Sequence, residues 1–276
     1  MQTSTIIVNG IEISYRDTGG NGPVVVCSSG ISQSKEFWDP QLEALSPDYR
    51  VIAWDYPNHG ESGLTHKTET APTYATFLIA FLDALGIKTA TLVGNSLGGA
   101  VSLQSYLKAR ERVNGLVLIA PAFMGKEVFF PFRLMTLPVL GNVMTKPSDK
   151  AVEMQLGGVF HDKDKITDTI RSATKRNTYK HGGADAFLAT MRATLGLRGV
   201  RPAVYETQNN ISKSVTCPIL FIHGRQDQIL PVKNSQLAAA ANNIARIEVI
   251  ENCGHAPQLE HPQQVNTLLK QFMVAT

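Results

Sequence analysis

The stretch "LVGNSLGGAV" at residues 92–101 places Ser96 between Gly94 and Gly98. Two interpretations are open, because serine is a favoured N-terminal cap of helices and glycine is common in turns. The apolar segment "ATLV" runs into Gly94, and the pattern after Ser96 predicts a helix. A serine on such a sharp strand-to-helix turn, with small residues on both sides, is typical of a nucleophile elbow. We therefore interpret Ser96 as a catalytic nucleophile.

Apolar segments that are continuous rather than alternating predict buried parallel strands. They lie at residues 24–27, 51–55, 91–95, 116–120, 219–224 and 247–251. Helical patterns alternate with them at residues 75–86, 98–112, 234–244 and 262–273. This alternation predicts an α/β protein with a mostly parallel sheet. Residues 5–8 and 13–17, joined through the Asn-Gly pair at positions 9 and 10, predict an antiparallel hairpin beside it.

The alternation of strands and helices stops after Ala120. Residues 121–212 contain no clear strand and predict a helical insertion over the carboxyl edge of the sheet. We therefore expect a core domain of residues 1–120 and 213–276 and a cap of residues 121–212. Residues 125–213 hold 14 lysines and arginines against 8 aspartates and glutamates. This excess indicates either a solvated helical surface or a preference for anionic substrates.

The composition is that of an ordinary globular protein and argues against some classes of partner. The 276 residues are 43% hydrophobic and carry a formal net charge of +3. Without a run of lysine and arginine, we expect neither a nucleic-acid partner nor a membrane partner. No leader and no segment long enough to cross a bilayer stand out. The widely separated Cys27, Cys217 and Cys253 predict core residues, no metal site and a reducing cytoplasm.

A serine nucleophile needs a base, and His255 is the best candidate. It follows the predicted strand at residues 247–251 after a short loop that contains glycine. We therefore expect His255 to lie at the same edge of the sheet as Ser96. The histidine His223 ends another predicted strand, and we interpret it as a packed residue.

The base in turn needs a carboxylate that orients it, and Asp227 is the candidate. It stands just past the predicted strand at residues 219–224. The alternative, Asp55, ends an earlier strand, where a carboxylate more often ties down a turn. The chain order of the predicted triad is thus Ser96, Asp227, His255.

The oxyanion of an acyl-transfer reaction needs two hydrogen-bond donors. One is expected to be the backbone N–H of Leu97, directly after the nucleophile. The other is expected in the loop "SSGIS" at residues 28–32, where we choose the Ile31 N–H, with Gly30 keeping the loop tight.

Motifs along nearly the whole chain resemble those of α/β-hydrolase-fold proteins. They are "GNSLGG" at residues 94–99, "WDYPNHGESG" at 54–63, "HGRQDQILP" at 223–231 and "CGHAPQLEHP" at 253–262. The order serine, aspartate, histidine is also the order of that family. The resemblance implies an eight-stranded sheet, a helical cap between the sixth and seventh strands, and no cofactor.

Two groups within that family share features with the chain. "GNSLGG" and the segment around His255 resemble the C–C bond hydrolases of aromatic meta-cleavage pathways. Those enzymes usually carry a glycine-rich loop after the third strand and a tryptophan after the histidine, whereas Ala256 stands here. The segment "SSGISQSKEFWDPQLEAL" at residues 28–45 instead resembles β-ketoadipate enol-lactonases.

The function that these motifs favour is hydrolysis of a carboxylic ester or lactone through an acyl-enzyme on Ser96. One alternative is C–C bond hydrolysis of a vinylogous diketone by the same triad. Another is a ligand receptor that keeps the fold and turns over slowly. We expect a small-molecule ester or lactone as the partner and a monomer or homodimer as the assembly.

Apolar residues at the start of the insertion are candidates for lining the substrate pocket, although packing between helices is the alternative. The candidates are Phe123, Met124, Phe129, Phe130 and Phe132, together with Leu97 and with Gly30 and Trp38 from the segment that follows the predicted strand at residues 24–27.

Overall fold

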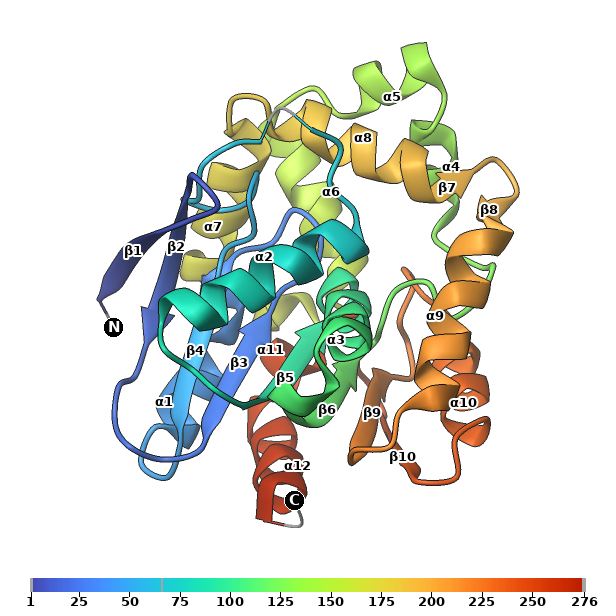
Figure 1. The fold of residues 1–276 in the computed structure, drawn as a ribbon. Helices are drawn as coiled ribbons and strands as arrows, with labels where there is room; N and C mark the ends of the chain where they lie inside the picture. The colour runs from blue at the N-terminus through green and yellow to red at the C-terminus, as the bar shows by residue number, and fades with distance from the viewer. Residues whose placement is uncertain (1, 66, 275–276) are drawn as a thin grey trace.

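A large mixed sheet lies at the centre of the computed structural model, which describes residues 2–65 and 67–274. Its eight strands lie in the order β1-β2-β4-β3-β5-β6-β9-β10 (Figure 1). Their bounds are β1 Thr3–Val8, β2 Ile11–Asp17, β3 Val24–Ser28, β4 Arg50–Trp54, β5 Ala90–Asn95, β6 Val113–Ile119, β9 Ile219–Gly224 and β10 Ala245–Ile250. From β4 to β10 in this order neighbouring strands are parallel, whereas β1, β2 and β4 pair antiparallel. The predicted α/β class is confirmed.

The sequence patterns place these strands to within three residues at either end. The central strand β5 is buried at every position, which explains its continuous apolar run. The predicted hairpin between β1 and β2 also forms. Asn9 and Gly10 have φ values of 49° and 79°, the left-handed pair that a tight two-residue hairpin needs.

Helices cover both faces of the sheet. One face packs against α2 Ala71–Ala84, α3 Leu97–Lys108, α9 Pro202–Ser214 and α10 Val232–Ala240. The other packs against α1 Asp39–Leu45 and α12 Pro262–Val274. Short turns of helix precede some of these elements: η1 Lys35–Trp38, η2 Arg110–Arg112 and α11 Pro257–Glu260. No helix among the described residues has the length and apolar character needed to cross a membrane.

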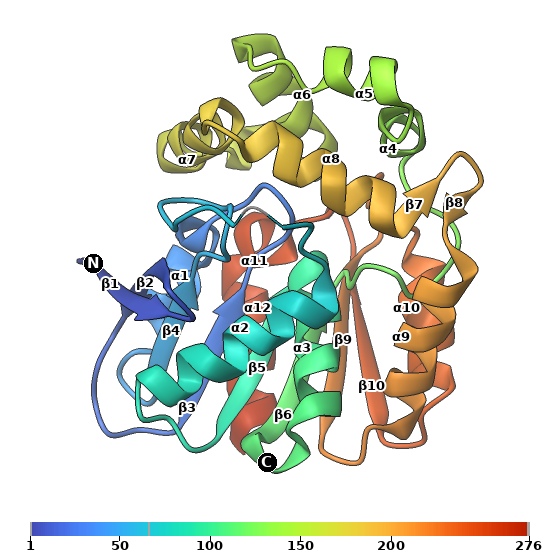
Figure 2. The ribbon, with the colours of Figure 1, turned by 45° about the horizontal axis from the view of Figure 1, so that its top comes forward.

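The segment between β6 and β9 lies mostly over the carboxyl ends of the parallel strands (Figure 2). It contains α4 Phe130–Met135, α5 Pro138–Met144, α6 Asp149–Val159, η3 Lys163–Lys165, α7 Asp168–Tyr179 and α8 Gly183–Thr194. We call these elements the cap helices. The division of the chain into domains of residues 1–120 with 213–276 and of residues 121–212 stays a prediction.

Two features of that segment differ from the helical pattern that its sequence predicts. A two-stranded hairpin, β7 Leu195–Gly196 with β8 Gly199–Val200, follows α8. Its turn depends on Gly199, whose φ of 104° is costly for any other residue. The helix that ends this segment, α9, does not lie over the strand ends. It lies beside α3, where Gln208 donates a hydrogen bond to the Ala100 carbonyl.

Candidate active site

Ser96 occupies the sharp turn between β5 and α3. Its φ of 55° and ψ of −117° are strained for a residue with a side chain, and its backbone N–H is held by the Ile119 carbonyl at 2.9 Å. The glycines on either side are required by close backbone approaches. A Cβ on Gly98 would lie 2.0 Å from the Ser28 carbonyl oxygen, and one on Gly94 would lie 2.2 Å from the Gly98 oxygen. The local sequence therefore forces the turn that presents the Ser96 side chain.

The predicted acid and base meet at the ends of β9 and β10. His255 Nδ1 lies 2.7 Å from Asp227 Oδ2, and both side chains are nearly or fully buried. The other carboxylate oxygen, Asp227 Oδ1, accepts the backbone N–H groups of Ile229 and Leu230 at 2.7 and 3.0 Å. The loop after β9 thus fixes the carboxylate, and the carboxylate fixes the tautomer and direction of the imidazole.

Three separate parts of the chain hold the loop that carries His255. Its backbone N–H donates to the Val159 carbonyl at the end of α6, at 2.8 Å. Its carbonyl accepts Asn95 Nδ2 at 3.0 Å, which links the base to the residue directly before the nucleophile. The preceding Gly254 N–H donates to Glu260 Oε1 at 2.7 Å. Ser96 and His255 are therefore neighbours, although within the described residues no hydrogen bond joins Ser96 Oγ to the imidazole.

The electrostatic environment keeps Asp227 ionised. Burial alone would raise the pKa of Asp227, but the neighbouring His255 and His223 rings outweigh burial and hold the pKa of this carboxyl well below its usual range. An ionised Asp227 can stabilise the positive charge that His255 gains when it takes a proton. The sequence indicates that His223 is a packed residue and does not predict its contact with the triad, in which its Nε2 lies 3.0 Å from Asp227 Oδ2. Its position four residues before Asp227 is the one feature of the sequence that could have indicated this contact.

The two predicted oxyanion donors flank the nucleophile. Leu97 is the first residue of α3, so its N–H has no partner within the helix and the helix dipole adds positive partial charge there. Ile31 lines the same pocket as Ser96. Gly30 allows this approach, because a Cβ at that position would lie 2.9 Å from Gln33 Oε1 and 3.2 Å from Ser96 Cβ. Their roles in stabilising an oxyanion stay predictions.

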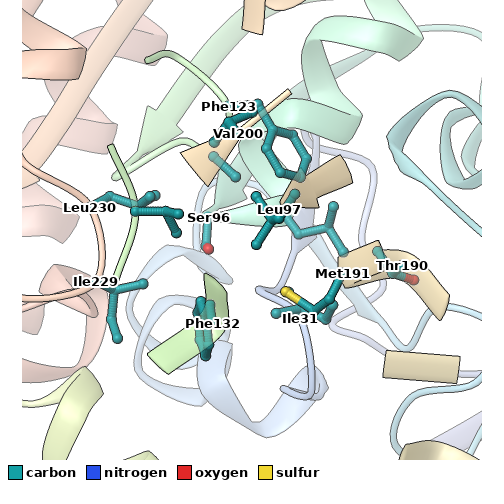
Figure 3. A pocket seen from close by; sticks show the side chains of 13 residues that line it. Ile31, Ser96, Leu97, Phe123, Phe132, Thr190, Met191, Val200, Ile229 and Leu230 are labelled. Atoms are coloured by element: carbon teal, nitrogen blue, oxygen red, sulfur yellow. The ribbon is translucent and has the colours of Figure 1, made fainter. Parts of the chain in front are cut away.

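A small apolar pocket of about 30 Å³ lies beside the Ser96 side chain (Figure 3). Side chains from the core loops, the cap segment and the loop after β9 line it. They are Ile31, Ser96, Leu97, Ala122, Phe123, Val128, Phe132, Thr190, Met191, Leu195, Val200, Ile229 and Leu230.

Of the predicted lining residues, Phe123, Phe132 and Leu97 line this pocket. Trp38 is fully buried and donates its indole N–H to Ser29 Oγ. Met124 is buried in the core cluster, and Phe129 packs edge-on against Phe132 without lining the pocket. Phe130 points to solvent, with 61% of its surface exposed. The expectation for these four residues is corrected, because composition reports which residues are apolar and not where their side chains point.

The alternative carboxylate, Asp55, has a different task from Asp227. It accepts the backbone N–H groups of Lys35 and Glu61 and the Lys35 ammonium, at 2.7, 2.9 and 2.9 Å. It therefore ties down the turn after β4, as the sequence suggests for a carboxylate at that position. Among the described residues no group of three or more histidine, cysteine, aspartate or glutamate side chains is placed to hold a metal ion.

Comparison with known proteins agrees with this fold. The family model described as alpha/beta hydrolase fold matches residues 23–262. A 2-hydroxy-6-oxo-6-phenylhexa-2,4-dienoate hydrolase of Burkholderia cepacia is 26% identical over 94% of this chain and 90% of its own length. A thermophilic esterase from Thermogutta terrifontis superposes with a TM-score of 0.80 at 23% identity, over 100% of this chain and 99% of the esterase. The enol-lactonase from Burkholderia xenovorans LB400 gives 0.79 at 21% identity, over 98% and 100%.

Proposed function

Because the chain belongs to the α/β hydrolase fold family, we propose that it is a serine hydrolase that cleaves a carboxylic ester or lactone through an acyl-enzyme on Ser96. The observation that carries this proposal is the strained Ser96 turn beside the buried His255–Asp227 pair. A strained serine next to an oriented base is what nucleophilic acyl transfer requires.

In the first half of the reaction, Ser96 Oγ attacks the ester carbonyl and His255 takes the hydroxyl proton. The carbonyl oxygen becomes an oxyanion, which the N–H groups of Leu97 and Ile31 stabilise. His255 then gives its proton to the departing alkoxide oxygen, so that an alcohol leaves and an acyl-serine remains. Asp227 stabilises the imidazolium between these two proton transfers and keeps its own charge.

In the second half, a water molecule attacks the acyl-serine and His255 takes one of its protons. Collapse of this second oxyanion breaks the bond to Ser96 Oγ, which recovers its proton from His255. The products are a carboxylic acid and the free enzyme. With a lactone, the alcohol and the acid are two ends of one molecule.

The second candidate is hydrolysis of a C–C bond, favoured by the 26% identity to the dienoate hydrolase. The substrate in that relative's name is a carboxylate, and its anionic end needs a partner wherever it is buried. Among the described residues, no cationic side chain lines the pocket next to Ser96. This absence favours an ester or lactone over a dienoate.

The test is turnover of a panel of 4-nitrophenyl esters by the wild type and by Ser96→Ala. We expect the variant to lose roughly 10⁴-fold or more in kcat, because a triad without its nucleophile keeps only binding and oxyanion stabilisation. Ser105→Ala is the matched control, since that hydroxyl is also on the buried side of α3 but donates to the Val101 carbonyl. Undiminished turnover in Ser96→Ala would refute the proposal.

Two further measurements separate the alternatives. Rapid consumption of a meta-cleavage product, followed by loss of its visible absorbance, together with poor ester turnover, would favour the C–C hydrolase. A single burst of 4-nitrophenol followed by a stall, at every substrate concentration, would favour a slow-turnover ligand receptor. Steady ester turnover without either result supports the proposed esterase.

A further inference from the structure

The pocket around Ser96 offers a substrate almost no polar group. Within residues 2–65 and 67–274, Thr190 is the one lining residue besides Ser96 that has a polar side chain. Its hydroxyl lies 2.7 Å from the Glu69 carbonyl oxygen and 3.1 Å from that of Ala186, so its proton is already used. Figure 3 shows the Thr190 oxygen turned away from Ser96. Thr190 therefore offers a substrate no free hydrogen-bond donor.

Three arginines directly follow lining residues, and their described hydrogen bonds go to other groups. Arg192 follows Met191, but its Nη2 donates to the Pro138 carbonyl and to Asn142 Oδ1, both at 3.1 Å. Arg201 follows Val200, and its Nη2 donates to the Arg192 carbonyl at 3.0 Å. Arg133 follows Phe132, and its Nε donates to the Val128 carbonyl at 3.2 Å. The basic excess of residues 125–213 therefore does not reach the space beside the nucleophile through these arginines.

We propose that this site selects esters whose acyl group is uncharged and apolar and rejects acyl groups that end in a carboxylate. The proposal rests on the proposed ester hydrolysis at Ser96. Its physical basis is desolvation. The described lining side chains offer no cation and no free donor, and the Leu97 and Ile31 N–H groups are taken by the ester carbonyl oxygen, so a carboxylate at the end of the acyl group loses its hydration and gains nothing in return. The methyl end of an alkyl chain gains from the same transfer.

The experiment compares two acyl groups of equal length. The substrates are 4-nitrophenyl butyrate and the mono-4-nitrophenyl ester of succinic acid, in which a carboxylate replaces the terminal methyl group. After correction for their alkaline hydrolysis rates, we expect kcat/KM to favour the butyrate by at least about 100-fold. A ratio within about tenfold would overturn the proposal while leaving ester hydrolysis standing. If neither ester is hydrolysed, the proposed function itself fails.

A pair of variants at Met191 ties the selectivity to this pocket. Met191→Arg places a guanidinium where the thioether lies, and we expect it to narrow the butyrate-to-succinate ratio by about tenfold or more. Met191→Leu keeps the volume and the apolar character, so we expect its ratio to stay near that of the wild type. An unchanged ratio in Met191→Arg would show that selection arises elsewhere. The wild-type comparison remains decisive even if Met191→Arg fails to fold.

A second, independent observation concerns the buried His223. Its side chain is fully buried, and its Nε2 lies 3.0 Å from both Asp227 Oδ2 and the Leu230 carbonyl oxygen. Both neighbours of Nε2 are acceptors, so Nε2 carries a proton. The other ring nitrogen, Nδ1, lies 2.8 Å from Ser235 Oγ. Asp227 Oδ2 thus accepts the His255 Nδ1 hydrogen bond and also lies 3.0 Å from His223 Nε2, whose single proton is shared between this oxygen and the Leu230 carbonyl.

The geometry points to His223 as a positioning residue of the triad. By donating to Asp227 Oδ2, it draws charge away from the oxygen that faces His255 and holds the carboxylate in the plane of that hydrogen bond. Without this donor, the same oxygen would attract the His255 proton more strongly. The titratable groups around Asp227 are these two histidines and Cys253 after β10, whose thiol pKa is raised by burial.

The test is the pH dependence of kcat/KM in His223→Phe, a variant that keeps most of the ring volume. We expect the acidic limb of the profile, which reports protonation of His255, to move upward by about half a pH unit or more. His223→Gln places an amide N–H near the position of Nε2, so we expect its acidic limb to lie at the wild-type position. An acidic limb that stays in place in His223→Phe would overturn this assignment.

Ser235→Ala is the matched control for packing around the same ring. It removes the partner of Nδ1 and leaves the Nε2 donor in place. We expect it to lower the melting temperature and to leave the acidic limb at the wild-type position. If Ser235→Ala moved the limb as far as His223→Phe does, disturbed packing rather than the donor would account for both shifts.

Discussion

At the scale of single residues, two aspartates at the ends of parallel strands have opposite tasks. Asp55 after β4 binds backbone N–H groups and a buried lysine, whereas Asp227 after β9 binds the histidine of the triad. Both carboxylates are nearly or fully buried. What separates a structural carboxylate from a catalytic one here is therefore its partners and not its burial.

This difference gives a prediction for two matched substitutions. Asp227→Asn is expected to lower kcat by roughly 10⁴-fold, because the amide cannot hold His255 in the tautomer that accepts the serine proton. Asp55→Asn is expected to lower the melting temperature, because it removes the fully buried carboxylate among the partners of the Lys35 ammonium. Ester turnover and thermal unfolding of both variants check this. Equal loss of activity per folded protein in the two variants would contradict the assignment.

At the scale of elements, the turn between β5 and α3 depends on backbone contact that only glycine permits. Gly98→Ala is expected to lower the free energy of unfolding by about 3 kcal/mol or more, because its Cβ would meet the Ser28 carbonyl and neither backbone segment can move freely. Gly157→Ala in α6 is the control. Its Cβ has no neighbour closer than 3.9 Å, so helix propensity should stabilise it by up to about 1 kcal/mol.

Chemical denaturation of both glycine variants measures these changes. A Gly98→Ala protein as stable as the wild type would show that the turn can relax, and the strain at Ser96 would then need another explanation.

The junction between α11 and the end of α6 is the second element-scale feature. Glu260 binds the Gly254 N–H with one oxygen and the N–H groups of His161 and Asp162 with the other. A single buried carboxylate therefore joins the loop of the catalytic histidine to the segment that follows α6. The position of this segment and the position of His255 are set by the same side chain.

Glu260→Gln is expected to lower the free energy of unfolding by about 1–3 kcal/mol, because the amide nitrogen cannot accept the N–H groups that it faces. It should also lower kcat, since the loop that carries His255 is held less firmly. Glu251→Gln, an exposed residue paired with Arg225, is the control and should change stability by less than about 0.5 kcal/mol. Denaturation and ester turnover together check the prediction; full activity in Glu260→Gln would contradict it.

At the scale of the whole molecule, a group of charges joins the cap helices to the sheet. Lys35, fully buried, binds Asp55 and Glu61. Arg176 on α7 binds Glu36 at 2.8 Å. Burial alone would raise the pKa of Glu36, but the Ser34 hydroxyl, Lys35 and Arg176 outweigh it and lower the pKa below its ordinary value. Ionised Glu36 therefore contributes to the attachment of α7.

The sign of the resulting pH dependence follows from this lowered pKa. The unfolded chain binds a proton at Glu36 more readily than the folded one, so its contribution is present above about pH 4.5 and is lost as the pH falls through the folded-state pKa. Asp55, whose pKa is raised by burial, acts in the opposite direction. The contribution of Glu36 is therefore isolated by comparing the wild type with Glu36→Gln.

We expect the stability difference between the wild type and Glu36→Gln to shrink as the pH falls from about 6 to about 3. Denaturant unfolding at a series of pH values measures it. Glu153→Gln, on an exposed pair with Arg171, should give a profile parallel to that of the wild type. A constant difference between the wild type and Glu36→Gln over the whole range would contradict the prediction.

What the sequence determined by itself was the sheet and the order of the triad candidates. Strand periodicity, the glycines beside Ser96 and the Asn-Gly hairpin act through neighbours in the chain, so their consequences can be derived locally. Placing Asp227 and His255 at one sheet edge needed only the rule that parallel strands end together. The two-residue strands β7 and β8 were missed because they are too short for periodicity to show.

Only the tertiary structure decided which side chains reach the reacting serine. Phe123 and Met124 are neighbours in an apolar segment, yet only Phe123 lines the pocket. Arg133 and Arg192 of the cap helices donate to carbonyl groups, and His223 Nε2 lies 3.0 Å from Asp227 Oδ2 across a loop. These outcomes depend on the directions of side chains from segments far apart in the chain. Composition and spacing carry no such directions, because packing between distant elements sets them.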